Sequence, residues 1–168
     1  FLGSKENQVR QVMEQANVLT YKVQRALVGD QALAREYSAS EIRQGQRPNG
    51  STDPTTAEYR FLRAQDFASY KLKITGMVEQ PLEFTLDELR NMPARSQITR
   101  HDCVEGWSCI AKWTGTQLGP ILDMARVKSG ARFAVYHCFD NIQRTLSGDI
   151  LYYESSDLVD AYHPQTLL

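Results

Sequence analysis

Long apolar runs, a dominant charge and a signal segment are all missing from this chain of 168 residues. No stretch is apolar over a length that could cross a bilayer. The net charge of -1 gives no sign of a general nucleic-acid or membrane-surface binder. The opening FLGSKENQ has neither a methionine nor the apolar segment that marks a secretory signal. With 42% hydrophobic and 23% charged residues, the composition is that of an ordinary globular protein with a real core.

Cysteine is scarce, with three residues in the whole chain. An odd number excludes a framework in which every cysteine is paired within the chain. A lone cysteine is most often a small buried hydrophobic residue. We predict that role for Cys109 and Cys138. Cys103 differs because of the side chains around it.

The first part of the chain predicts one long helix over residues 6–28. Its apolar side chains recur every three or four positions, and Gly29 supplies a stop. A shorter helical segment, QALAREY, is expected to follow. We therefore predict an N-terminal helical arm, residues 1–37, ahead of a larger domain, residues 38–168. Residues 38–58 show no hydrophobic period and predict a long loop, a kind of segment that is usually functional or disordered.

From residue 70 onward, alternating and apolar stretches indicate strands mixed with short helices. The predicted strands are YKLKITG, PLEF, RSQITRH, ARFAVYHCFD and DILYYESS, with the apolar run ARFAVYHCFD expected to be buried. The predicted helices are TLDELRNMP, with a capping box from Thr85 to Glu88, TQLGPILDMARV and DLVDAYHP. Because these elements lack a strict βαβ order, the fold class is α+β.

The segment RHDCVEGWSCIAKW concentrates reactive and aromatic side chains just after a predicted strand. A strand end is a common place for a site, because the scaffold fixes a side chain that still reaches solvent. Arg100 and His101 would favour a thiolate at Cys103, whereas Asp102 and Glu105 would oppose it. A thiolate is both a nucleophile and a soft metal ligand.

The residues alone leave three interpretations of Cys103 open. It could be a nucleophile with His101 or His137 as its base. It could join His101, His137 and Cys138 in a zinc site, although their spacing is not a usual zinc pattern. It could also donate a single protein thiolate to a metal that an organic cofactor mainly holds. In an apolar strand, the ordinary role of His137 is a core histidine.

The segment ITRHDCVEGWSCIAKWTG resembles the cysteine motif of the sulfite oxidase family of molybdenum enzymes. Members carry a cysteine followed by Val-Glu, a small residue and Trp, and then a Trp-x-Gly. The matching residues here are Cys103, Val104, Glu105, Gly106, Trp107, Trp113 and Gly115. The similarity is greatest to bacterial periplasmic members, the group that includes the catalytic subunit of the methionine-sulfoxide reductase. It runs from the loop near residue 47 to the end of the chain.

This resemblance implies that Cys103 is the catalytic residue and the molybdenum ligand. The other ligands would be the dithiolene sulfurs of one molybdopterin, a pyranopterin, and oxo groups, and a soft thiolate suits such a metal. The segment RPNGS matches a family segment whose asparagine lies beside the pterin, which maps onto Asn49. Glu105 and Trp107 would line the same site. The implied fold is the sulfite oxidase-type molybdopterin-binding fold, a mixed β-sheet with surrounding helices.

The implied chemistry is two-electron oxygen-atom transfer on a small sulfur-oxo or related substrate. Electrons would pass singly to or from a redox partner such as a cytochrome or a membrane haem subunit. The resemblance also implies a periplasmic protein that is not itself transmembrane and binds no nucleic acid. Sulfite oxidases flank the asparagine with an Arg and a His, where this chain has Pro48 and Gly50. Sulfite is therefore not the expected substrate.

Family domains continue beyond a segment like HPQTLL, so we expect this chain to lack the C-terminal part of the domain. Two alternatives belong to other functional classes. One is a non-catalytic relative that keeps the fold as a binding or scaffold domain, and the other is a zinc-binding domain. Metal content separates them, since molybdenum, no metal and zinc are the three expected results.

Overall fold

The chain consists of two compact units, residues 1–32 and 33–168. The computed structural model describes residues 2–29, 31–43, 45, 47, 51–103, 105–145 and 148–168. Within these ranges, no helix has both the length and the apolar character needed to cross a membrane. The division that the sequence predicts between residues 37 and 38 stays a prediction.

The first unit is built on a single helix, α1 (Leu2–Val28). Arg10 and Glu14 form an i,i+4 ion pair with a distance of 3.2 Å between Nε and Oε1, which supports the helix along its surface. The helix ends at Gly29, whose φ is +77° and whose amide donates to the Arg25 carbonyl at 2.8 Å. The helix predicted over residues 6–28 is confirmed, and it begins four residues earlier than predicted.

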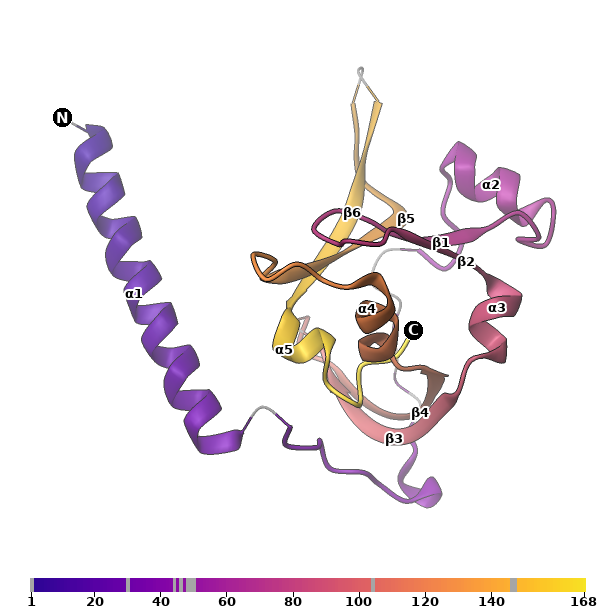
Figure 1. The fold of residues 1–168 in the computed structure, drawn as a ribbon, viewed down its shortest axis with the longest axis horizontal. Helices are drawn as coiled ribbons and strands as arrows, with labels where there is room; N and C mark the ends of the chain where they lie inside the picture. The colour runs from indigo at the N-terminus through magenta and orange to yellow at the C-terminus, as the bar shows by residue number, and fades with distance from the viewer. Residues whose placement is uncertain are drawn as a thin grey trace. The chain divides into compact units, whose positions relative to one another are not determined.

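The second unit mixes short helices with antiparallel strand pairs, which confirms the α+β class (Figure 1). Its helices are η1 (Ala39–Glu41), α2 (Ala57–Arg63), α3 (Leu86–Asn91), α4 (Leu118–Ala125) and α5 (Leu158–Ala161). Its strands are β1 (Lys71–Ile74), β2 (Leu82–Thr85), β3 (Ala94–Asp102), β4 (Ser108–Thr116), β5 (Phe133–Thr145) and β6 (Gly148–Asp157). Among the described residues they pair as β1–β2, β3–β4 and β5–β6, all antiparallel. The β-structure of the predicted mixed sheet thus takes the form of small antiparallel ribbons.

Helix α4 supplies the centre of the core. Its apolar residues follow the spacing of one helical face, and the buried ones are Leu118, Ile121, Leu122 and Ala125. Ile121 is 1% exposed. Ala161 of α5 and the half-buried residues around it pack against Leu118 and Leu122. This cluster joins α4, α5 and the inner face of the β5–β6 ribbon into one hydrophobic core.

The prediction that ARFAVYHCFD forms a buried strand is half wrong. The strand exists, but Phe133 and Val135 are 59% and 50% exposed. Ala134 and Tyr136, on the opposite face, pack against the core. An apolar run suggests burial on both faces, whereas a two-stranded ribbon resting on α4 and α5 covers only one. His137 lies on the exposed face as well, so it is not the core histidine that the sequence suggests.

Local signals around residues 70–93 are confirmed. Strands β1 and β2 pair with Lys71 opposite Thr85. The capping box also forms, since Thr85 Oγ1 accepts from the Glu88 amide at 3.2 Å and Glu88 Oε2 accepts from the Thr85 amide at 2.7 Å. Hydrogen bonds from the Thr85 backbone and side chain lower the pKa of Glu88. Helix α3 is therefore specified by residues next to it in sequence.

The helix predicted for QALAREY is wrong. Residues 33–37 of this stretch belong to a segment that we call the strap, residues 33–43, which lies beside β3 and is extended apart from the short helix η1. Glu36 pairs with Thr99, and the Tyr37 amide donates to the Ile98 carbonyl at 2.9 Å. At its far end, Arg43 pairs with Ile110 of β4. Pairing with strands distant in sequence therefore overrides the local helical preference.

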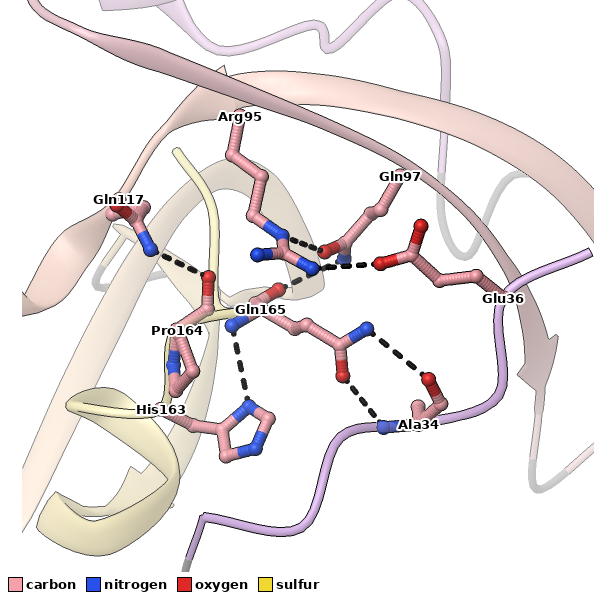
Figure 2. A network of polar contacts seen from close by, with 8 residues as sticks. All are labelled: Ala34, Glu36, Arg95, Gln97, Gln117, His163, Pro164 and Gln165. Atoms are coloured by element: carbon pink, nitrogen blue, oxygen red, sulfur yellow. Dashed lines mark hydrogen bonds and ion pairs between the residues drawn. The ribbon is translucent and has the colours of Figure 1, made fainter.

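A polar network fixes the strap to β3 and to the C-terminal segment (Figure 2). The Gln165 side chain makes two hydrogen bonds to the backbone of Ala34. It accepts from the Ala34 amide at 2.6 Å and donates to the Ala34 carbonyl at 3.3 Å. Arg95 Nη2 donates to Glu36 at 2.7 Å, and Arg95 Nε donates to Gln97 at 3.1 Å. Gln97 in turn donates to the Gln165 carbonyl at 3.0 Å. The strap is thus held by contacts with residues that are distant from it in the sequence.

Replacing Gln165 with alanine is expected to loosen the strap. The variant loses both hydrogen bonds to Ala34. Its free energy of unfolding should fall by about 1–2 kcal/mol, because each hydrogen bond contributes about 1 kcal/mol. Amide hydrogen exchange at Ala34 should accelerate, while exchange in α3 stays unchanged. The matched control is Gln80→Ala at an exposed position, which should alter neither. Unchanged exchange at Ala34 in Gln165→Ala would contradict the role of this side chain.

Candidate functional site

Cys103 lies in the tight turn that joins β3 to β4. The strand pairing ends at Asp102 opposite Ser108. Beyond it, the Cys103 amide donates to the Trp107 carbonyl at 2.9 Å, and the Gly106 amide donates to the Cys103 carbonyl at 3.0 Å. Gly106 has a φ of +86°, a conformation that glycine adopts without steric cost. The turn therefore fixes the Cys103 backbone, and its thiol is half-buried and free of disulfide bonding.

Aromatic rings stand beside this turn. The Trp107 indole donates to Glu105 Oε2 at 3.0 Å. The imidazole of His101 lies between two indoles, with ring centroids 5.6 Å from Trp107 and 6.1 Å from Trp113. Glu105 and Trp107, two of the predicted site residues, are thus in contact with each other. His101 and Trp113 join them through ring contacts that the sequence did not predict.

The one arginine of the turn around Cys103 is paired with an acid. Arg100 Nε donates to Asp102 Oδ1 at 2.8 Å, so the guanidinium that could favour a thiolate is already paired with a carboxylate. Both side chains are more than half exposed, which makes the pair a weak one energetically. Glu105 adds a second acid on the far side of the turn. The turn therefore presents no excess positive charge from its own residues.

The strap directs the long loop toward this turn. After Arg43 pairs with Ile110, the backbone passes the start of β4. A Cβ placed on Gly45 would lie 3.7 Å from the carbonyl oxygen of Ser108, the residue that pairs with Asp102. Gly45, four residues before the predicted residue Asn49, thus lies beside the hairpin. Asn49 itself and Val104 of the motif lie outside the described residues.

The other two cysteines, Cys109 and Cys138, lie within strands and not in the hairpin turn. Cys109 is 3% exposed, which confirms its predicted role as a buried hydrophobic residue. Cys138 is only half-buried, so its predicted burial is partial. Burial raises the pKa of the Cys138 thiol, and the acidic side chains of Asp140 and Glu154 raise it further. The Cys138 thiol is therefore less acidic than an ordinary cysteine thiol.

The zinc site considered as an alternative is not found among the described residues. In the part of the chain that the structure describes, no three His, Cys, Asp or Glu side chains form a group that could hold a metal ion. The alternative set predicted from the sequence, His101, Cys103, His137 and Cys138, therefore does not come together. A structural zinc site requires four ligands from the protein.

The residues present do fit a metal that a cofactor mainly holds. Such a metal needs one soft protein ligand in a fixed and reachable place, which is what Cys103 provides. Among the described residues other than its chain neighbours, no atom lies within 4 Å of the point where a Cβ on Gly106 would sit, so the turn is open at this position.

Comparison with known proteins decides the family. Residues 60–168 match the family described as "Oxidoreductase molybdopterin binding domain". This chain belongs to that family. The match includes β3, β4 and the turn with Cys103, so the resemblance drawn from the motif around Cys103 is confirmed at the level of the family.

Named relatives cover part of the chain. A putative protein-methionine-sulfoxide reductase subunit YedZ1 from Azospira oryzae is 38% identical over 107 residues, or 64% of this chain and 37% of the relative. The protein-methionine-sulfoxide reductase catalytic subunit MsrP from Campylobacter jejuni is 31% identical over 114 residues, or 62% of this chain and 38% of the relative. The chain thus spans well under half the length of these relatives. The sulfane dehydrogenase SoxCD from Paracoccus pantotrophus matches with a TM-score of 0.44 and 20% identity, covering 56% of this chain and 27% of that one.

The main site feature that the sequence reasoning missed is strand β4. SCIAKWTG follows the turn with small or apolar residues at Cys109, Ala111 and Trp113, every second position. This alternation is the usual sign of a half-buried strand. Recognising it would have placed Cys103 in a hairpin turn and Trp113 on the same face as Cys109.

Proposed function

We propose that this chain is the molybdopterin-binding part of a molybdenum oxidoreductase, with Cys103 as the protein ligand of the metal. The observation that carries the proposal is the position of this thiol. It is the half-buried, geometrically fixed cysteine of the hairpin turn, inside the region that matches the molybdopterin-binding family. Molybdenum held by one molybdopterin supplies two-electron oxygen-atom transfer when bound.

The residues of this chain would position that group. Cys103 supplies the thiolate, and the two backbone hydrogen bonds of its turn hold its direction. The contact between Trp107 and Glu105 fixes both side chains at the rim of the same site. Asn49 would contact the pterin from the long loop, in which Gly45 lies close to Ser108. The protein's contribution is therefore placement and polarity.

The proposed substrate is a sulfoxide. Two relatives carry methionine-sulfoxide reductase in their names. The charge of the turn supports the same class, because its one arginine, Arg100, is already paired with Asp102 and an anion such as sulfite would also meet Glu105. Reduction of a sulfoxide breaks its S–O bond, takes up two electrons and two protons, and releases a thioether and water. The electrons would come singly from a redox partner such as a cytochrome or membrane haem subunit, in the periplasm.

Elemental analysis of the purified protein by mass spectrometry tests this function. We expect about one molybdenum per chain, since one thiolate serves one metal centre. Protein expressed in a host that lacks molybdopterin synthesis is the control and should contain none. A folded sample without molybdenum would instead favour a non-catalytic scaffold domain, and stoichiometric zinc would favour the zinc alternative. Either result would contradict the proposal.

A further inference from the structure

We propose that His101, Trp107 and Trp113 form an aromatic platform that binds the organic part of a neutral sulfoxide beside Cys103. The inference rests on the proposed function and extends it, because it assigns substrate-binding roles to His101 and Trp113. The platform's occupant is a sulfoxide with apolar substituents, such as a methionine sulfoxide side chain whose neighbouring groups carry no charge.

The strand register brings these rings to one face. His101 stands directly opposite Cys109, and Trp113 stands opposite Gln97, four residues before His101 on β3. Opposite residues in an antiparallel pair point to the same side, and so do residues separated by an even number along a strand. The β3–β4 ribbon is curved (Figure 1). The His101 ring accordingly reaches both indoles, at 5.6 Å and 6.1 Å between centroids.

The three platform rings are only partly covered by other residues, whereas Cys109, on the same face of the strands, is 3% exposed. His101 is exposed, and Trp107 and Trp113 are half-buried, so parts of all three rings remain accessible. The hydrogen bond from the Trp107 indole to Glu105 satisfies its polar edge and holds the ring in place. Accessible ring surface with its polar edge satisfied is suited to apolar groups and to sulfur, which contacts aromatic rings favourably.

Charge favours a neutral occupant over an anion. The turn region, residues 100–108, contains one Arg and no Lys, and that Arg100 is paired with Asp102 at 2.8 Å. Glu105 lies at the edge of the platform, in contact with Trp107. A sulfite or sulfate ion beside the turn would meet these acids, and the one cation of residues 100–108 is already paired. A sulfoxide carries a strong dipole without net charge and avoids that repulsion.

Tryptophan fluorescence can read this platform directly, because Trp107 and Trp113 are the two tryptophans of the whole chain. The probe is the methyl ester of N-acetylmethionine sulfoxide, titrated into the molybdenum-loaded protein and into metal-free protein. We expect a saturable change in emission with both samples. Trp113→Leu and His101→Ala should each weaken binding by about 2- to 10-fold, the range expected for sulfur–aromatic contacts. His101 is exposed, so its variant is expected to fold normally.

The control variant is Phe61→Leu, which removes an aromatic ring that is 62% exposed on α2 and should leave binding unchanged. Sulfite should neither change the emission nor compete with the probe. The platform is overturned if both variants bind the probe as tightly as the original protein, or if sulfite competes equally well. Molybdenum content, measured on the same samples, reports on the proposed function separately. A loaded protein without any saturable response would reject the platform and leave the metal assignment standing.

Discussion

Replacing Cys103 with serine is expected to remove molybdenum from the protein while leaving the fold intact. A serine hydroxyl stays protonated near neutral pH and is a hard donor, so it cannot replace a soft thiolate on a sulfur-bound metal. Oxygen-atom transfer should fall by more than about 100-fold, since loss of outer-shell partners alone costs about 10–100-fold at metal sites. Stability should stay within about 0.5 kcal/mol, because the substitution is nearly isosteric and the side chain is only half-buried.

The matched control is Cys109→Ser, six residues along the same hairpin. Cys109 is 3% exposed, so this variant buries a hydroxyl and should lose about 1–3 kcal/mol of stability. Its folded fraction should nevertheless retain molybdenum. The two variants therefore separate metal binding from folding, with denaturant melts and metal analysis as the measurements. A Cys103→Ser protein that keeps its molybdenum and its turnover would remove the ligand assignment.

The parts of the fold that could be read from the sequence are those fixed by neighbours in the chain. Helix α1 has continuous helical spacing and a glycine stop, and α3 has its capping box, so both were predicted. Strands β1 and β2 alternate apolar and polar residues, and they pair as neighbours in sequence. In each case the interactions that decide the structure lie within a few residues of one another.

The parts that failed depend on contacts between distant segments. The strap sequence QALAREY has helical propensity, but Glu36 and Tyr37 pair with β3 some sixty residues later, and Gln165 reaches back to Ala34. The exposure of one face of β5 likewise depends on tertiary structure, because no second layer covers that face of the β5–β6 ribbon among the described residues. An apolar run records a preference for burial, and only the tertiary arrangement determines whether a second layer covers Phe133 and Val135.

The motif around Cys103 could be predicted from the sequence, whereas the contacts between the side chains beside it could not. The motif around Cys103 pointed to the family that the match over residues 60–168 confirms. The contacts of His101 with Trp107 and Trp113 could not be derived from spacing, because they depend on side-chain directions at the end of a hairpin. These ring contacts are the basis of the substrate platform that we propose.

Gly115, the last residue of the motif, is expected to be intolerant of alanine for a reason of packing. A Cβ at this position would collide with the main-chain carbonyl of Leu168, whose carbonyl carbon would lie 3.0 Å away. Leu168 is held there by its own amide, which donates to the Thr116 carbonyl at 2.8 Å. Backbone cannot rotate aside as a flexible side chain can, so the C-terminal segment must move away from β4.

We expect Gly115→Ala to lower the free energy of unfolding by about 1–3 kcal/mol. Overpacking costs roughly 1–3 kcal/mol, and loss of the Leu168–Thr116 hydrogen bond adds about 1 kcal/mol. The lower entropy of the unfolded alanine chain offsets about 0.4–1 kcal/mol. For a protein of this size the change corresponds to a Tm lower by roughly 3–10 °C in calorimetry.

Gly45→Ala is the matched control, because its added Cβ would lie 3.7 Å from the Ser108 carbonyl oxygen, an ordinary contact. Its Tm should stay within about 2 °C of the original, since substitutions without a steric conflict change stability by about 0.5 kcal/mol or less. Amide exchange at Leu168 should accelerate in Gly115→Ala and stay unchanged in Gly45→Ala. If both variants melt alike and Leu168 remains protected, the C-terminal segment does not need glycine beneath it, and Gly115 belongs to the motif for some other reason than packing.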